Sequence, residues 1–363
     1  MDLHILPGVK ARDVAEAHRL DLMIQGDHRC NCMTYWIDEK RGTVFCLIDA
    51  PNKAAVSEMH RNAHGLIPHK IIEVNDSLVE AFLGRIHDPE NATLVVDGLH
   101  VFSEESLRIV MVILMSDPIL LEHKMGKEKA SAHLRNQYYI IQKELASHDG
   151  SEVKLGGTDC VASFVSAGHA IRCAMTISDL LKDLSQGSAT LHIGLHAGEP
   201  VSRMEKIFGE TIQLATILGS LTKDFQVAIS SVVKELAGRE HIRYDEHQIA
   251  RLTASEESFL EKLFSFLEER WQDTEFTMDD LSHLMALSTS QLYRKTLSLT
   301  GYSPHNLLKE FRLHRAKELM KRAGSTIAEV TFQSGFSSPS YFTKCFKKKY
   351  GLLPNTYMDL AGM

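Results

Sequence analysis

The 363-residue sequence is poor in the features that mark secreted or membrane proteins. No apolar run approaches the roughly 20 residues that a membrane-spanning helix needs, and MDLHILPGVKARDVAEAH lacks the basic-then-apolar order of a signal peptide. The 6 cysteines, three of them close together and three scattered, form no disulfide framework. We therefore expect a cytoplasmic protein, and its length predicts two or three domains.

Charge is unevenly distributed along the chain, which carries −7 overall at neutral pH. Residues 288–350 hold twelve Lys or Arg against three Glu, so this segment carries +9 and the remainder carries −16. A basic module attached to an acidic body is typical of a protein that meets nucleic-acid phosphates. A solvated helix face produces the same pattern, so charge alone leaves both interpretations open.

The basic segment lies within residues 255–363, where every pattern is helical. Two helix-turn-helix units are expected, one with its second helix capped by Ser288 and one with a tight turn at Gly335. The stretch between them, HNLLKEFRLHRAKELMKRAG, has one apolar and one basic face. A rigid helix there would hold two reading helices about 34 Å apart, which is one turn of DNA.

The residues GYSPHNLLKEFRLHRAKELM and IAEVTFQSGFSSPSYFTKCFKKKYGLLPNTY resemble the AraC/XylS family of transcription regulators. The resemblance implies tandem helix-turn-helix units that bind promoter DNA, usually in activation together with RNA polymerase. It places candidate DNA contacts on the two reading helices: Ser290, Gln291, Arg294, Lys295, Ser338, Ser340, Tyr341, Lys344 and Lys347. The basic face of the linking helix adds Arg312 and Arg315 as candidates.

Residues 107–245 have a mixed α/β order. HDGSEVKLGGTDCVASFVSAGHAIRCAMTI, LHIGLHAGEPV and FGETIQLATILGSL resemble the class III nucleotide cyclase domain. The positions of that family's two metal-binding aspartates, its asparagine and its arginine hold other residues: Leu114, Thr158, Gln213 and Ile217. Asp117 and Asp159 are nearby but displaced. We therefore expect a degenerate domain without enzymatic activity, which pairs subunits, relays a signal, holds an effector or is a spacer.

Residues 1–76 show a helix, two strands, a helix and a strand, with room for a first strand before them. This order predicts a ferredoxin-like α+β sandwich. Potential metal ligands concentrate here: His18, Asp21, Cys30, Cys32, Cys46, His60 and His64. His60 and His64 share one helix face because they are four residues apart. Imidazole with thiolate suits nickel, zinc or copper, although 19 histidines will also cluster by chance.

The stretches AHRLDL, GTVFCL and APNKAAVSEMHRNAHG resemble small ferredoxin-like nickel-binding proteins. The resemblance implies an oligomerising sandwich with a divalent transition-metal site, with nickel the first candidate and zinc or copper the next. The sequence CNC departs from the usual pattern, so individual ligands do not transfer by resemblance.

Together these patterns predict a multidomain protein of α+β and all-α parts. The expected parts are a ferredoxin-like sensor (1–76), a linker (77–106), a degenerate cyclase-like α/β domain (107–245) and a double helix-turn-helix domain (255–363). We expect an effector-responsive DNA-binding activator that forms a homo-oligomer, most simply a dimer. The alternatives are a metal-buffering protein with a DNA-binding tail and an active nucleotide cyclase.

Overall fold

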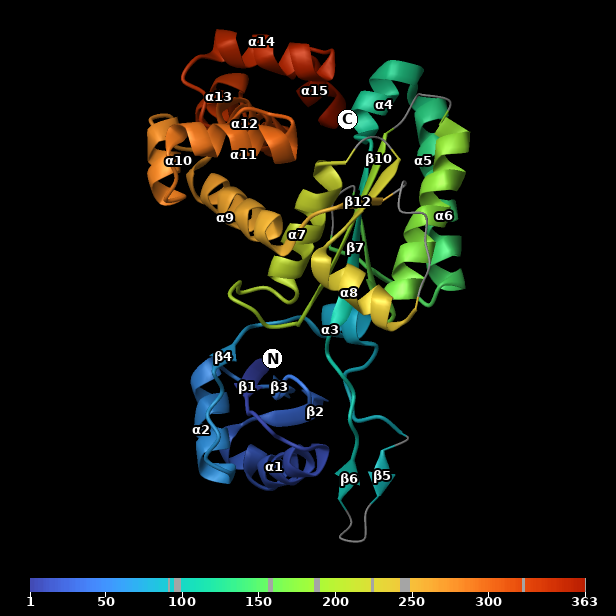
Figure 1. Ribbon diagram of the computed structural model, residues 1–363, viewed down its shortest axis with the longest axis vertical. Helices are drawn as coiled ribbons and strands as arrows, with labels where there is room; N and C mark the ends of the chain where they lie inside the picture. The colour runs from blue at the N-terminus through green and yellow to red at the C-terminus, as the bar shows by residue number, and fades with distance from the viewer. Residues whose placement is uncertain are drawn as a thin grey trace.

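The computed structural model describes residues 1–90, 92–94, 99–155, 159–185, 190–222, 225–241, 249–321 and 324–362, so Thr158 lies outside the described residues. Three modules follow one another along the long axis of the molecule (Figure 1). The N-terminal module lies at one end, a sheet flanked by helices in the middle, and an all-helical C-terminal module at the other end. Within the described part, no helix has both the length and the apolarity to cross a membrane.

The N-terminal module is the expected ferredoxin-like sandwich. Its antiparallel sheet has the order β2-β3-β1-β4. Alternate residues of β2 and β3 point to opposite faces: Tyr35 and Val44 pack with α1, whereas Trp36 and Phe45 pack toward the middle module. The elements are β1 (Asp2–Ile5), α1 (Ala11–Ile24), a 3-10 turn (Gln25–His28), β2 (Asn31–Asp38), β3 (Thr43–Asp49), α2 (Lys53–Ala63) and β4 (Lys70–Ile71).

The range expected to be a linker contains regular structure. Helix α3 (Asp76–Leu83) buries Val79, Phe82 and Leu83, and two short strands that follow, β5 (Thr93–Leu94) and β6 (His100–Val101), pair antiparallel. The buried face of α3 joins one apolar cluster with Trp36 of the N-terminal sheet and with the middle sheet. The segment between the two modules therefore contributes to a core that both share.

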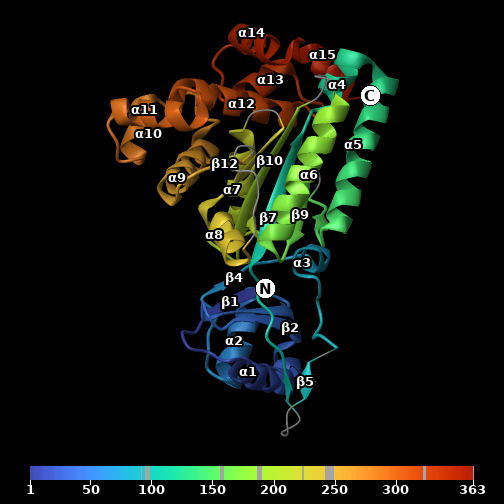
Figure 2. The same ribbon diagram turned by 45° about the vertical axis from the view of Figure 1, so that its right-hand side comes forward.

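The middle module is a six-stranded mixed sheet of order β12-β11-β10-β7-β9-β8. Ile109, Met111 and Ile113 of β7 face the cluster formed with α5, α6 and α8, while Val110 and Val112 face α3 and α7. Helices α5 and α6 lie on one side of the sheet and α7 lies on the other (Figure 2). The elements are β7 (Arg108–Met115), α4 (Pro118–Met125), α5 (Lys127–Ser147), β8 (Ser151–Val153), β9 (Cys160–Phe164), α6 (Ala167–Ser185), β10 (Leu191–Gly198), α7 (Gly209–Ser220), β11 (Gln226–Ile229), α8 (Ser231–Arg239) and β12 (Ile249–Arg251).

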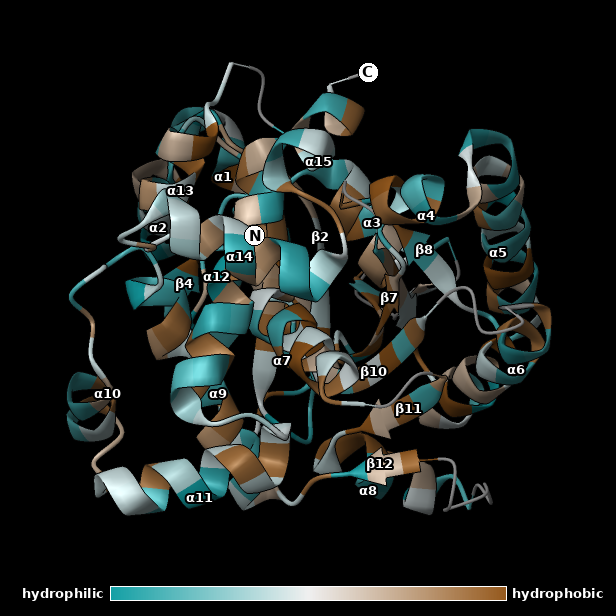
Figure 3. Cartoon of the chain, turned by 90° about the horizontal axis from the view of Figure 1, so that it is seen from above, coloured by the Kyte–Doolittle hydropathy of each residue, from teal (hydrophilic) through white to brown (hydrophobic). Residues whose placement is uncertain are grey.

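The C-terminal module is helical throughout its described residues and lies on the side of α7, across the sheet from α5 and α6 (Figure 3). Thr277, Ser288 and Thr326 begin three of its helices with complete capping boxes, in which each cap hydroxyl accepts a backbone N–H. The elements are α9 (Ala254–Arg270), α10 (Met278–Leu284), α11 (Thr289–Thr300), α12 (Pro304–Met320), α13 (Ile327–Gln333), α14 (Pro339–Tyr350) and α15 (Pro354–Ala361).

Candidate DNA-binding surface and candidate metal centre

Both expected reading helices begin with a side-chain cap. Ser288 accepts the N–H of Gln291 at 3.2 Å, and the side-chain oxygen of Gln291 accepts the N–H of Ser288 at 3.0 Å. Ser338 accepts the N–H of Tyr341 at 3.4 Å, with Pro339 at the first helical position. The caps fix the start of each helix, so Ser290 and Ser340 lie in the first turns of α11 and α14. Gln291 already uses its amide oxygen within the cap.

Each reading helix has one buried apolar face and one exposed polar face. Leu292 in α11 and both Phe342 and Phe346 in α14 are buried. The predicted contact residues outside the caps are exposed: Ser290, Arg294, Lys295, Ser340, Tyr341, Lys344 and Lys347. Tyr293, which the sequence prediction omitted, is 49% exposed on the same helix as Arg294. The two helices thus offer basic, aromatic and hydroxyl groups, which suit phosphates and base edges.

The two predicted contacts on the linking helix have partners inside the protein. Arg312 donates from Nε to the Trp271 carbonyl at 2.8 Å and from Nη2 to the Asp273 carbonyl at 2.6 Å. Arg315 pairs with Glu268 of α9. Helical periodicity identified a basic face on α12, but it could not show that a carboxylate of α9 and two carbonyls just after α9 lie against it. Both guanidinium groups therefore hold α12 against α9.

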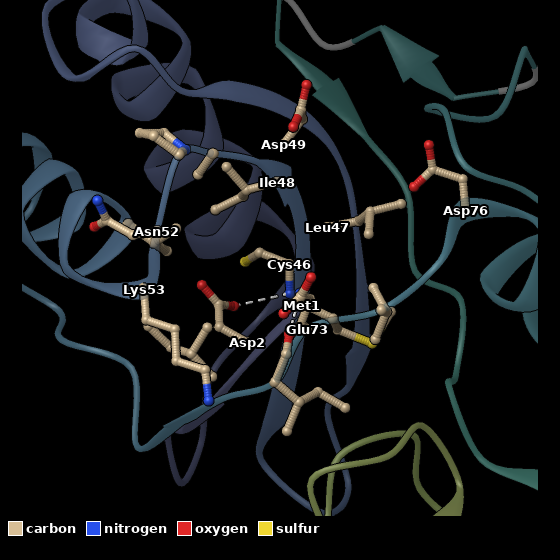
Figure 4. Close-up of a pocket in the computed structure, with 16 residues that line it drawn as sticks. Met1, Asp2, Cys46, Leu47, Ile48, Asp49, Asn52, Lys53, Glu73 and Asp76 are labelled. Carbon is tan, nitrogen blue, oxygen red and sulfur yellow. Dashed lines mark hydrogen bonds between the residues drawn. The ribbon is translucent and has the colours of Figure 1, made fainter.

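Four predicted metal ligands come together in the N-terminal module. Two groups of potential ligand atoms, each within 4.8 Å, share His60: one adds Asp21 and His64, and the other adds Asp2, His4 and Cys46. The sequence prediction omitted Asp2 and His4. Their positions two apart on one strand, beside a His- and Cys-rich segment, were the signal that could have identified them. Backbone pairing places Asp2 opposite Cys46, whose N–H donates to Asp2 Oδ1 at 3.1 Å (Figure 4).

The other three predicted ligands lie outside both groups. His18 lines the same cavity of about 50 Å³ as His4, Cys46, His60 and His64, but its Nε2 lies 3.8 Å from Asp88. Cys30 donates to the His28 carbonyl at 3.5 Å, and the Cys32 sulfur lies 3.7 Å from that of Met59. These two cysteines pack with Met59 in a small apolar cluster, where burial raises the pKa of each thiol.

The protonation states of the shared site follow from burial and its carboxylates. His60 binds Asp2 through Nε2 at 2.9 Å and Asp21 through Nδ1 at 3.0 Å. Burial would lower the pKa of His60, but the hydrogen bonds to these two carboxylates prevail and raise it to about 9. Burial lowers the pKa of His4 to about 4 and raises that of the Cys46 thiol well above its usual value. His60 is therefore a cation between two anions, and His4 is neutral.

These residues fit a divalent transition metal. Among the described residues, the Nε2 atom of His4 is buried without a hydrogen-bond partner, although it lies 3.6 Å from Asp2 Oδ1. A metal ion would use this nitrogen and would replace the proton of His60 as the positive charge facing Asp2. Imidazole, thiolate and carboxylate donors together match nickel, zinc or copper better than magnesium or calcium. Asp2 and Cys46 also line a second cavity of about 410 Å³ (Figure 4).

Two parts of the chain match known families. Residues 281–359 match the helix-turn-helix domain family HTH_18, and residues 1–74 match the family of SCO4226-like nickel responsive proteins. Among curated relatives, the HTH-type transcriptional regulator MtrA of Neisseria gonorrhoeae is 31% identical over 90 residues, which cover 25% of this chain and 30% of that protein. The matched region of MtrA is thus less than a third of its length.

Another curated relative and a solved structure overlap larger parts of the chain. Histidine kinase P4 of Formosa agariphila is 28% identical over 144 residues, 38% of this chain but 10% of that protein. The crystal structure of an adenylate/guanylate cyclase/hydrolase from Silicibacter pomeroyi matches with 19% identity and a TM-score of 0.33, covering 38% of this chain and 83% of that one.

Proposed function

The C-terminal part of the chain is an AraC-type helix-turn-helix domain, and on that premise we propose that the protein is a sequence-specific transcription regulator of promoter DNA. It acts in the cytoplasm as an effector-responsive activator and contacts RNA polymerase. The observation that carries the proposal is the pair of capped reading helices, α11 and α14, whose exposed faces are basic. The two helix-turn-helix units to which they belong are joined by a 17-residue helix, α12, that is about 26 Å long.

We assign different tasks to the side chains of the reading helices. Arg294 has the planar fork that pairs with guanine in the major groove, and Tyr341 offers a ring and a hydroxyl to a neighbouring base. Lys344 and Lys347 bind phosphates as point charges. Arg312 and Arg315 are not DNA contacts in this proposal, because their guanidinium groups hold α9. We therefore expect each reading helix to bind one half-site of the DNA.

We assign the sensing of a divalent metal, nickel first, to the site centred on His60. Asp2, His4, Cys46 and His60 would hold the ion, while Asp21 and His64 orient His60 from its other side. Metal must displace the proton of His60 and that of Cys46, so metal affinity rises with pH. The match of residues 1–74 to a nickel-responsive family supports this assignment. We also propose that two copies of the chain pair into a dimer.

We also propose that the middle module performs no cyclase chemistry. Leu114 stands nearest the position of the cyclase family's first metal-binding aspartate. The carboxylate of Asp117 instead accepts hydrogen bonds from Lys317 and Tyr357. Ile217, at the position of the family's transition-state arginine, is apolar and 3% exposed. Residues of this kind cannot neutralise the developing charge of a transferring phosphate.

Selection of bound duplexes from a random DNA library, with the full chain at fixed salt, tests the DNA-binding proposal. We expect an enriched motif with two half-sites about one helical turn, or roughly 10 base pairs, apart. Arg294→Ala should relax the preference within one half-site, whereas the control Lys129→Ala, an exposed lysine on α5, should leave the motif unchanged. Enrichment of no sequence would refute the proposal. Incubation with ATP or GTP should release no cyclic nucleotide.

The metal assignment is tested with the selected duplex. Its affinity is measured with Ni²⁺, Zn²⁺ or Cu²⁺ added and again after chelation, for wild type and His60→Ala. We expect one metal to change the affinity several-fold in wild type only. Metal binding at His60 without any change in DNA affinity would instead show a metal-buffering protein with a DNA-binding tail.

A further inference from the structure

The middle module contacts the C-terminal module at two separate places. At the first, Leu214, Ile217 and Leu218 of α7 share one apolar cluster with helices α9, α10, α11 and α12, which include the first helix-turn-helix unit. At the second, Ile119 and Leu120 of α4 pack against the cluster that forms the core of the second unit. The first unit is therefore joined to the middle module through α9, which packs on α7, whereas the second unit packs on α4 through α15.

The second contact contains a buried ion pair. The Nζ atom of Lys317, on the linking helix α12, lies 2.9 Å from Oδ2 of Asp117, and the side chains are 11% and 6% exposed. The hydroxyl of Tyr357, on α15, donates to the same oxygen at 2.9 Å. The other oxygen of Asp117 caps α4 by accepting the N–H groups of Ile119 and Leu120 at 3.0 and 3.4 Å. One carboxylate thus joins three helices from two modules.

A buried ion pair fixes geometry more strictly than an apolar contact. If the helices slid past one another, Lys317 and Asp117 would each remain desolvated without a partner, which is strongly unfavourable. Apolar contacts such as those of Ile119 lose little when they shift by a fraction of a side chain. The orientation of α12 relative to the middle module is therefore set mainly by Asp117.

We propose that the middle module is a clamp that holds the two helix-turn-helix units in one orientation for DNA, with Asp117 as the positioning residue. The exposed faces of α11 and α14, which carry Arg294 and Lys347, take no part in either contact, so the clamp leaves them open to DNA. A fixed orientation raises affinity because binding of one half-site presents the second unit at high effective concentration. The benefit of the clamp to DNA binding rests on the proposed function, whereas the fixed orientation of the two units does not.

Asp117→Asn is the direct test. Asparagine is as good a helix cap as aspartate, so α4 keeps its start while the ion pair loses its anion. In hydrogen exchange of the full chain without DNA, we expect faster exchange in α12 and α15 and unchanged exchange in α5 and α6. The matched control is Glu122→Gln, which removes the same charge from the same helix. Unchanged exchange in α12 and α15 of Asp117→Asn would overturn the clamp.

DNA affinity separates positioning from general stability. Asp117→Asn should weaken binding to a selected duplex with both half-sites about tenfold, and binding to a duplex with one half-site less than about twofold. The double variant Asp117→Asn/Lys317→Met should regain stability in thermal unfolding, since no buried charge then lacks a partner. It should not regain affinity for the duplex with both half-sites, because an apolar contact does not fix the orientation of α12. Equal losses on both duplexes, or tighter binding by Asp117→Asn, would contradict a clamp that favours DNA binding. If Asp117→Asn loosens α12 and α15 but the wild type selects no DNA motif, the proposed function is refuted while the clamp stands.

Discussion

Replacing Phe82 with alanine would show how closely the N-terminal and middle modules depend on each other. Phe82 is 2% exposed on α3, and its ring centroid lies 4.6 Å from that of Phe208 in the middle module. The same cluster contains Trp36 of the N-terminal sheet and Val112 of the middle sheet. Truncation of a buried phenylalanine costs about 3–5 kcal/mol, a large part of the roughly 5–15 kcal/mol that stabilises a typical domain.

The assay is urea unfolding monitored by hydrogen exchange, which reports separately on the strands β2–β3 and β7–β10. Because the cavity opens between the two sheets, both sets of amides should lose protection by a similar free energy in Phe82→Ala. The control is Tyr139→Ala, which removes a ring that is 65% exposed and should change stability by less than about 0.5 kcal/mol. A loss below about 1 kcal/mol, or one confined to a single sheet, would refute the shared core.

Four further predictions concern the two functional parts of the chain. Lys347→Ala should lower the salt dependence of DNA affinity by about one phosphate contact without changing the selected motif, measured from 50 to 200 mM salt. Gly335→Ala should destabilise the C-terminal module by more than about 1 kcal/mol in thermal unfolding, because Gly335 has φ +76° and an added Cβ would lie 2.1 Å from the Trp271 carbonyl. Cys46→Ser should weaken metal binding at least about tenfold in calorimetric titration, since it removes the only sulfur of the ligand group. Burial would raise the pKa of Asp117, but Lys317 and Tyr357 prevail and hold this pKa below its usual value of 3.8. The ionised carboxylate therefore stabilises the folded protein fully above about pH 4, and this stabilisation is lost as the pH falls through the lower pKa of the folded state. The difference in unfolding midpoint between wild type and Asp117→Asn should accordingly shrink in acid.

The C-terminal module could be predicted well from sequence because its signals are local. Ser288 and Thr326 begin helices through bonds to residues three positions away, and Gly335 supplies the positive φ of a tight turn. Such bonds depend on neighbouring residues in the chain, so they can be recognised without knowledge of the fold. The ferredoxin-like order of the N-terminal module was predictable for a similar reason, since period-2 and period-3.6 patterns identify strands and helices.

Helix α3 illustrates where local signals end. Its eight residues are too few to show a helical period clearly, and its stability comes from burying Phe82 between two sheets. The metal group poses a similar problem. The spacing of Asp2 and His4 offers a weak signal in the sequence, but only the pairing of β1 with β3 shows that they lie beside Cys46. The DNA contacts on the reading helices remain predictions, whereas the partners of Arg312 became known only from the packing of α9.

The sequence by itself determined the kinds of modules in this protein, because caps, turns and periodic patterns are properties of short stretches of chain. The tertiary structure alone decided how those modules act on one another. Asp117 and Lys317 are separated by 200 positions, yet they form a buried pair that no local pattern records. Long-range pairs of this kind are selected by desolvation and shape when the modules pack together, so they become visible only in the folded molecule.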